Sequence, residues 1–126
     1  MDLNITKILH SSLLVKDTKQ SLTFYCDVLG LEVDDSRPDL GFPGAWLCVG
    51  SQQIHLLELP NPDPVAGRPE HGGRDRHTAL QVTDIDVLLG RLEKAGIPFT
   101  RSKSGRKAVF TRDPDGNALE FVESGV

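Results

Sequence analysis

Hydrophobic and polar residues alternate along several short segments of the chain, while two other segments repeat apolar residues at helical spacing. Alternation predicts half-buried strands, and apolar residues three and four positions apart predict amphipathic helices. We expect helices after Asp17 and Asp84, each ending near a glycine, Gly30 and Gly96. We expect strands within residues 10–17, 31–33, 45–50, 53–59, 77–84, 97–99, 106–112 and 117–123.

The two halves of the chain repeat each other at an offset of 67 residues, since HSSLLVKD at 10–17 aligns with HTALQVTD at 77–84. Each half reads as strand, helix and three strands, which predicts an α+β fold. Residues 60–69 hold four of the eight prolines and read as an extended linker. We therefore expect one domain over 1–126, with a first module over about 5–60, a linker over about 60–75 and a second module over about 76–123.

The composition narrows the function classes. The 126 residues carry a net charge of −4, and no run of Lys or Arg supplies the basic face that nucleic-acid binding needs. No apolar run approaches the roughly 20 residues of a membrane helix, and no signal-peptide pattern opens the chain. We expect a cytoplasmic protein that binds neither nucleic acid nor membrane. The two cysteines, Cys26 and Cys48, are expected to be reduced thiols.

Four polar side chains occupy equivalent positions in the two halves. His10 and His77 lie on the first strand of each half, and His55 and Glu120 lie on the last strand, 45 and 43 residues downstream. If the two half-sheets close against each other, three imidazoles and one carboxylate meet. That donor set suits Zn, Ni, Co, Fe, Cu or Mn. The alternative is that each histidine is a hydrogen-bonded structural residue.

Other polar and aromatic residues are weaker candidates. Alternation along the strands turns Glu58 and Glu123 to the opposite face. His71 precedes the second module and either lines the mouth of the site or belongs to a flexible loop. Four arginines near strand ends either bind a substrate carboxylate or are solvated surface residues: Arg74, Arg76, Arg106 and Arg112. Helix packing and a strand core account for the aromatic residues Phe24, Tyr25 and Trp46.

Several stretches resemble the vicinal oxygen chelate superfamily of glyoxalases, bleomycin resistance proteins and extradiol dioxygenases. They are SLTFYCDVLGLEV at 21–33, QIHLLE at 53–58 and above all FTRDPDGNALEF at 110–121. The resemblance, closest to small glyoxalase I-like proteins, implies two βαβββ modules that form an incomplete barrel around one divalent metal ion. It implies Ni, Co, Zn, Mn or Fe bound by His10, His55, His77 and Glu120.

The resemblance also implies a metal-dependent lyase or isomerase that acts on a small molecule chelated through vicinal oxygens. His55 stands where glyoxalase I generally has a glutamate. Leu14 and Leu59 stand where the glutathione-dependent enzymes tend to carry Arg and Asn, so a strictly glutathione-dependent reaction is not expected. Glu120, the one carboxylate of the set, is a candidate general base, or else a ligand alone.

Two alternatives stay open. An extradiol-type dioxygenase would use a His-His-Glu site of His10, His77 and Glu120. A bleomycin-type resistance protein would bind a drug without catalysis and typically lacks the metal ligands. Modules in this superfamily often pair across two chains, so we expect a homodimer.

Overall fold

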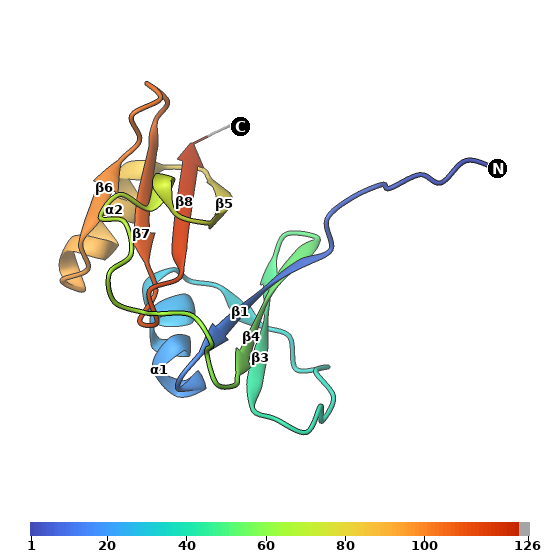
Figure 1. The fold of residues 1–126 in the computed structure, drawn as a ribbon. Helices are drawn as coiled ribbons and strands as arrows, with labels where there is room; N and C mark the ends of the chain where they lie inside the picture. Colours follow the sequence, from blue (N-terminus) through green and yellow to red (C-terminus); the bar gives the residue numbers. More distant parts are fainter. Residues whose placement is uncertain (124–126) are drawn as a thin grey trace.

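Two open four-stranded sheets organise the molecule, one from each half of the chain (Figure 1). The computed structural model describes residues 1–123. The first sheet has the order β1-β4-β3-β2 and the second has the order β5-β8-β7-β6. In each sheet the outer pair, β1 with β4 or β5 with β8, is parallel, and the other neighbours are antiparallel. The expected α+β fold of two βαβββ modules is confirmed, with sheets that stay open.

The elements follow the same order in both modules. The first contains β1 (His10–Val15), α1 (Thr18–Leu22), a π-helical segment η1 (Thr23–Val28), β2 (Glu32–Val33), β3 (Gly44–Val49) and β4 (Gln52–Glu58). The second begins with a short 3-10 turn, η2 (Gly72–Arg74), and continues with β5 (His77–Val82), α2 (Ile85–Lys94), β6 (Phe99–Arg101), β7 (Ala108–Arg112) and β8 (Ala118–Glu123).

The last residues of β4 and β8 each cap the helix of their own module. Glu58 accepts a hydrogen bond from the backbone N–H of Thr18 at 2.8 Å, and Glu123 accepts one from Ile85 at 3.0 Å. A carboxylate at a helix N-terminus satisfies a free N–H and opposes the helix dipole. Both glutamates therefore face the helices, as alternation predicts, and the opposite face of each sheet is left for the candidate site.

The first helix differs from the prediction because it widens into a π-helical segment, η1, after Leu22. The backbone N–H of Leu29 donates to the carbonyl of Phe24, five residues earlier. This wider turn buries two consecutive aromatic residues, Phe24 and Tyr25, which meet edge to face at 4.9 Å. A regular helix would turn consecutive side chains about 100° apart, so core packing has overridden the simple helical pattern.

The hairpin at 113–117 joins the two modules. Asp113 is buried and accepts a 2.7 Å hydrogen bond from the hydroxyl of Tyr25. Asn117 donates to the backbone carbonyl of Leu14 at 3.0 Å, and Asp115 accepts from the backbone N–H that follows β1. Burial raises the pKa of Asp113, against the hydrogen bonds it receives from Asn117 and Tyr25. The DPDGN motif is therefore one of the polar connections between the modules, beside the contact of Ser11 with Thr78 at 3.1 Å.

The carboxylate of Asp75 connects the linker to the second module. Asp75 accepts hydrogen bonds from Arg68 at 3.0 Å and from Arg112 at 2.8 Å, with only 11% of its side chain exposed. The Arg112 hydrogen bond, followed by those from Arg68, lowers the pKa of Asp75 to about 2. Both cysteines are free thiols. Within residues 1–123, no helix has the length and apolar character needed to span a membrane.

Candidate metal centre

His10 and His55 form the first half of the candidate centre. They project from the parallel strands β1 and β4 on the face away from the helices, with Ser12 paired to His55. Their rings stack at 3.9 Å between centroids with an interplanar angle of 15°. Trp46, which pairs with His55 across β3 and β4, stacks on the other side of His55 at 4.6 Å. The three rings form one continuous stack.

A short hydrogen-bond chain orients His55. The side-chain amide of Gln53 donates to Asp34 at 2.8 Å, so its oxygen is left to accept from Nε2 of His55 at 2.7 Å. Nε2 therefore carries the proton, and Nδ1 keeps a lone pair. Burial lowers the pKa of His55, and the neighbouring charges of His10 and Arg37 lower it further. A neutral imidazole is the form that binds a metal ion.

His77 and Glu120 form the second half, on the parallel strands β5 and β8. Nδ1 of His77 donates to the backbone carbonyl of Asp75 at 2.9 Å, which leaves Nε2 available for a second partner. That nitrogen faces Oε1 of the buried Glu120 at 3.3 Å. Arg106 donates to the second oxygen, Oε2, at 2.9 Å. Phe110 meets the ring of His77 edge to face at 5.1 Å.

The donor chemistry fits a divalent ion. Nε2 of His77 and Oε1 of Glu120 face each other at 3.3 Å, and a cation between an imidazole nitrogen and a carboxylate would be attracted to both. The spacing suits two donors that share one ion with bonds of about 2.0–2.2 Å. Imidazole and carboxylate are ligands for Zn, Ni, Co, Fe and Mn. The donor types and spacing of His77 and Glu120 therefore fit a divalent ion.

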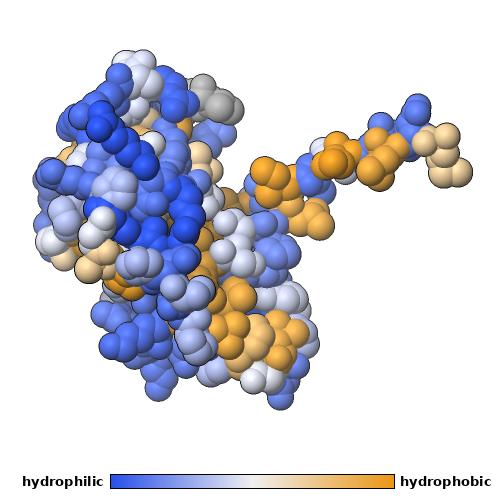
Figure 2. Space-filling view, in the orientation of Figure 1, coloured by the Kyte–Doolittle hydropathy of each residue, from blue (hydrophilic) through white to orange (hydrophobic). Residues whose placement is uncertain are grey.

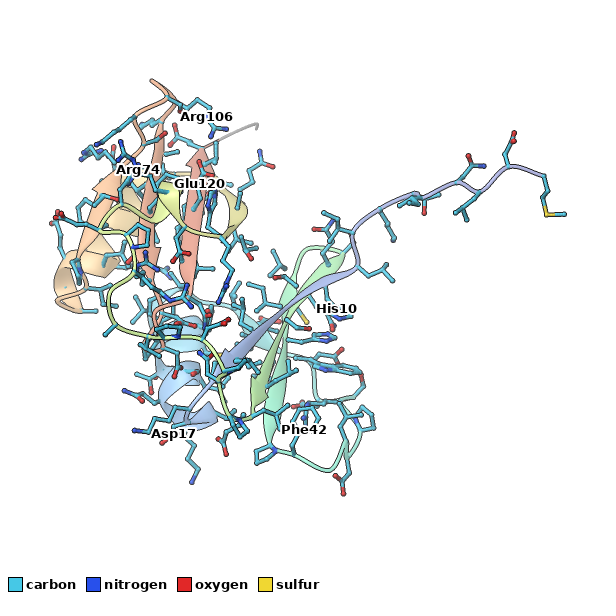
Figure 3. The ribbon with its side chains drawn as sticks, in the orientation of Figure 1. His10, Asp17, Phe42, Arg74, Arg106 and Glu120 are labelled. Atoms are coloured by element: carbon cyan, nitrogen blue, oxygen red, sulfur yellow. The ribbon has the colours of Figure 1, made fainter. Side chains whose placement is uncertain are left out.

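The two halves do not meet within one chain. Among residues 1–123, no three His, Cys, Asp or Glu side chains gather closely enough to hold a metal ion. Figure 3 places His10 on the sheet of the first module and Glu120 on the sheet of the second, with the two side chains well apart. The structure therefore brings the four predicted residues together two by two.

The other polar candidates have partners of their own. His71 contacts Thr100 Oγ1 at 2.8 Å through Nδ1 and packs edge to face on Phe110. Arg106 binds Glu120 and therefore belongs to the candidate centre. Two further arginines form ion pairs that stabilise the linker: Arg76 with Asp63 and Arg112 with Asp75. Arg74 is exposed at the end of η2.

Two residues beside the centre were missed by sequence reasoning. The expectation that Trp46 lies in the strand core is wrong, because the neighbouring Leu47 takes the core position at 0% exposure while Trp46 stacks on His55. Strand alternation, with His55 opposite, was a usable signal for Trp46. Arg37 lies in the loop between β2 and β3, where no periodic pattern points to a site.

Comparison with known proteins identifies the family of the chain. The Glyoxalase/Bleomycin resistance protein/Dioxygenase superfamily model matches residues 7–121. The chain is 32% identical over 125 residues to "Glyoxylase I 4" of Arabidopsis thaliana, covering 94% of this chain and 71% of that protein. It is 31% identical over 129 residues to the "Lactoylglutathione lyase" of Haemophilus influenzae, covering 94% and 93%.

A solved structure agrees as well. A glyoxalase family protein from Bacillus anthracis superimposes with a TM-score of 0.80 at 27% sequence identity, covering 99% of this chain and all of the other. The match therefore extends over both modules and over the strands that carry the four candidate ligands. The chain belongs to the Glyoxalase/Bleomycin resistance protein/Dioxygenase superfamily, also called the vicinal oxygen chelate superfamily.

Proposed function

We propose that this chain is a metal-dependent lyase or isomerase of the glyoxalase type. It would transfer a proton at the carbon beside a carbonyl in a small substrate that binds through two vicinal oxygens. The observation that carries this proposal is the approach of Nε2 of His77 to Oε1 of the buried Glu120 at 3.3 Å, a spacing that a shared divalent cation would fit. The family membership supports the same reaction class.

The metal site would be shared between two copies of the chain. His10 and His55 of one subunit would join His77 of the partner subunit and Glu120 of the partner subunit. The separation of the two pairs within one chain supports this homodimer. The N-terminal arm supports it too, because residues 1–9 extend away from both sheets and expose Leu3 and Ile5 at 89% and 91% (Figures 1 and 2). Exposed apolar surface of this kind favours association.

Each residue of the site has a definite task in this proposal. A bound divalent ion stabilises negative charge on substrate oxygens and acidifies the adjacent C–H bond. Glu120 would accept the proton from that carbon once its Oε1 is released from the ion, while Arg106 keeps the other oxygen in place at 2.9 Å. Gln53 and the carbonyl of Asp75 hold the two flanking imidazoles in single tautomers. Phe110 and Trp46 cover the histidine rings with apolar surface.

The substrate would be smaller than a glutathione adduct. Leu14 and Leu59 offer no polar group at the positions where a tripeptide would be held. One carboxylate among four ligands leaves a divalent ion with a formal charge of +1, which favours an anionic oxygen. The related lactoylglutathione lyase therefore informs the reaction type rather than the substrate.

The test is proton exchange in deuterated water. Protein loaded with Ni, Co, Zn, Mn or Fe in turn is incubated with small 2-oxo aldehydes and 2-hydroxycarbonyl compounds, and deuterium in the recovered substrate is measured by NMR. We expect exchange that the Glu120→Gln variant loses by about 100-fold or more while it still binds metal. No exchange with any metal and substrate, or equal exchange by the variant, would overturn the proposal.

A second candidate is a non-catalytic binder of planar ligands. The continuous stack of Trp46, His55 and His10 favours it, because an exposed aromatic stack offers a surface for another flat ring. Metal content of protein purified without added metal separates the two functions. A negligible metal fraction, with no change of the melting temperature on addition of Ni or Zn, would support the binder.

A further inference from the structure

A small pocket lies beside the stacked histidines of the first module. Its volume is about 210 Å³, and the loop between β2 and β3 forms one wall of it. The opposite wall is the ring stack. The residues that shape it are Arg37, Leu40, Phe42, His10, Trp46 and His55. Figure 3 shows Phe42 on the same module as His10, and Figure 2 shows apolar surface over this module.

Arg37 supplies the one full positive side-chain charge of this pocket. Its Nη2 donates to the backbone carbonyl of Phe42 at 2.8 Å, and its Cζ lies 5.3 Å from the centre of the Phe42 ring. Its Nε is buried and has no hydrogen-bond partner. Within residues 1–123, no carboxylate lies at ion-pair distance from this guanidinium, whereas Arg68, Arg76, Arg106 and Arg112 all have one.

The guanidinium of Arg37 lies close to the backbone at Gly44. A Cβ atom on Gly44, the first residue of β3, would come within 3.0 Å of Nη2 of Arg37 and 2.1 Å of the carbonyl oxygen of Leu56. The close approach of the Leu56 carbonyl is therefore the main reason for glycine at this position, and the guanidinium of Arg37 lies next to the same backbone. A buried donor without a partner is unfavourable, and the only hydrogen bond of this guanidinium within the described residues is the one from Nη2, so the side chain keeps donor capacity for an anionic ligand.

We propose that Arg37 binds the carboxylate of an aromatic monocarboxylate substrate, whose ring lies among Trp46, Phe42 and Leu40. This inference rests on the proposed function and narrows its substrate class. A cavity of about 150 Å³ holds benzene, so a pocket of about 210 Å³ has room for one ring with its carboxylate. Planar forked donors bind carboxylates in preference to neutral oxygens.

Trp46 is the only tryptophan of the chain, so its fluorescence reports this pocket directly. The probes are 3-phenylpropionate and its neutral analogue 3-phenylpropan-1-ol, titrated into the full-length protein with and without a metal chelator. We expect the acid to bind about 10- to 100-fold more tightly than the alcohol. We expect the Arg37→Gln variant to bind the two probes equally.

Arg101→Gln is the matched control, because Arg101 is exposed on β6 and lines no part of this pocket. It should keep the preference of the natural sequence for the acid. If Arg37→Gln does not fold, Arg37→Lys serves instead and should weaken acid binding, since a lysine lacks the planar fork. Equal binding of acid and alcohol by the unaltered protein, no binding of either, or a preference that survives loss of Arg37, would overturn the proposal.

The two proposals fail separately in these experiments. Binding with the chelator present depends on Arg37 and not on a metal ion, whereas deuterium exchange depends on the metal-loaded site. Acid-selective binding without deuterium exchange would support carboxylate binding by Arg37 and contradict the proposed enzyme function. Deuterium exchange without a preference for the acid would support the enzyme function and contradict a role of Arg37 in substrate recognition.

Discussion

Asp75 connects the candidate centre to the linker through two different groups. Its backbone carbonyl accepts the Nδ1 hydrogen of His77, and its carboxylate accepts from Arg68 and Arg112. The two arginines therefore hold the residue that sets the tautomer of a proposed ligand. Support of this kind fixes the orientation of a metal-binding imidazole and its basicity.

This arrangement predicts a specific dependence of stability on acid. The pKa of Asp75 is lowered to about 2 in the folded protein. The carboxylate therefore stabilises the fold at pH values above the pKa of the unfolded chain, which is near 3.8. That contribution is lost as the pH falls from about 4 to about 2. Asp75→Asn should lower the free energy of unfolding at pH 7 by about 2 kcal/mol. The free energy of unfolding of this variant should also depend less on pH between about 4 and about 2, which urea unfolding across this range measures.

The control for this experiment is Asp63→Asn, which removes a more exposed carboxylate paired with Arg76 in the same linker. Exposed ion pairs contribute about 1 kcal/mol or less. Equal losses in the two variants, or an unchanged acid profile in Asp75→Asn, would contradict the assignment.

At the scale of elements, the hairpin between β7 and β8 has two roles. It connects the strands that carry Phe110 and Glu120, and it docks the second module onto the first through Asp113, Asp115 and Asn117. Its last turn requires a positive φ of 83° at Gly116, the left-handed region that other residues rarely adopt. The DPDGN turn of the family motif is thus explained by conformation and docking, whereas Glu120, near the end of the same motif, carries the proposed chemistry.

A pair of glycine substitutions tests the hairpin. Gly116→Ala should lower the free energy of unfolding by about 1–3 kcal/mol, because alanine is strained at this φ. Gly90→Ala is the opposite case, since Gly90 lies inside α2 and a Cβ there meets nothing within 4 Å. It should stabilise the protein by up to about 1 kcal/mol. Chemical denaturation of both variants measures this, and a neutral Gly116→Ala would refute the conformational argument.

At the scale of the whole molecule, the two modules behave as two half-sites. Each presents a pair of donors on the face away from its helix, and neither holds a complete ligand set. If two chains assemble the centre, one chain can supply the ligands that another lacks. Symmetric pairing would then create two equivalent sites.

Complementation between variants tests this assembly. A His10→Ala/His55→Ala chain and a His77→Ala/Glu120→Gln chain should each bind no metal as homodimers. After subunit exchange, half of the dimers are mixed and carry one intact site, so metal binding should recover to about a quarter of the wild-type level. Recovery is read by metal analysis of the whole mixture after subunit exchange. No recovery, in chains that fold and exchange, would place the site within a single chain.

Much of the fold was predictable because its signals are local. Alternation placed the strands to within one or two residues for β3, β4, β7 and β8, and both aspartate N-caps behave as predicted. The opposite orientation of Glu58 and Glu123 followed from strand parity. The widened turn at Phe24 and Tyr25 was not predictable, because it depends on the core against which both rings pack.

The sequence by itself determined the two-module α+β fold and the equivalence of His10 with His77 and of His55 with Glu120. A repeat and a strand period are properties of the chain, and they survive whatever the chain packs against. Only the tertiary structure decided which polar groups meet. It paired the candidate ligands two by two and brought Arg37 and Trp46 to the first pair, because such contacts depend on strand register and loop path between distant segments.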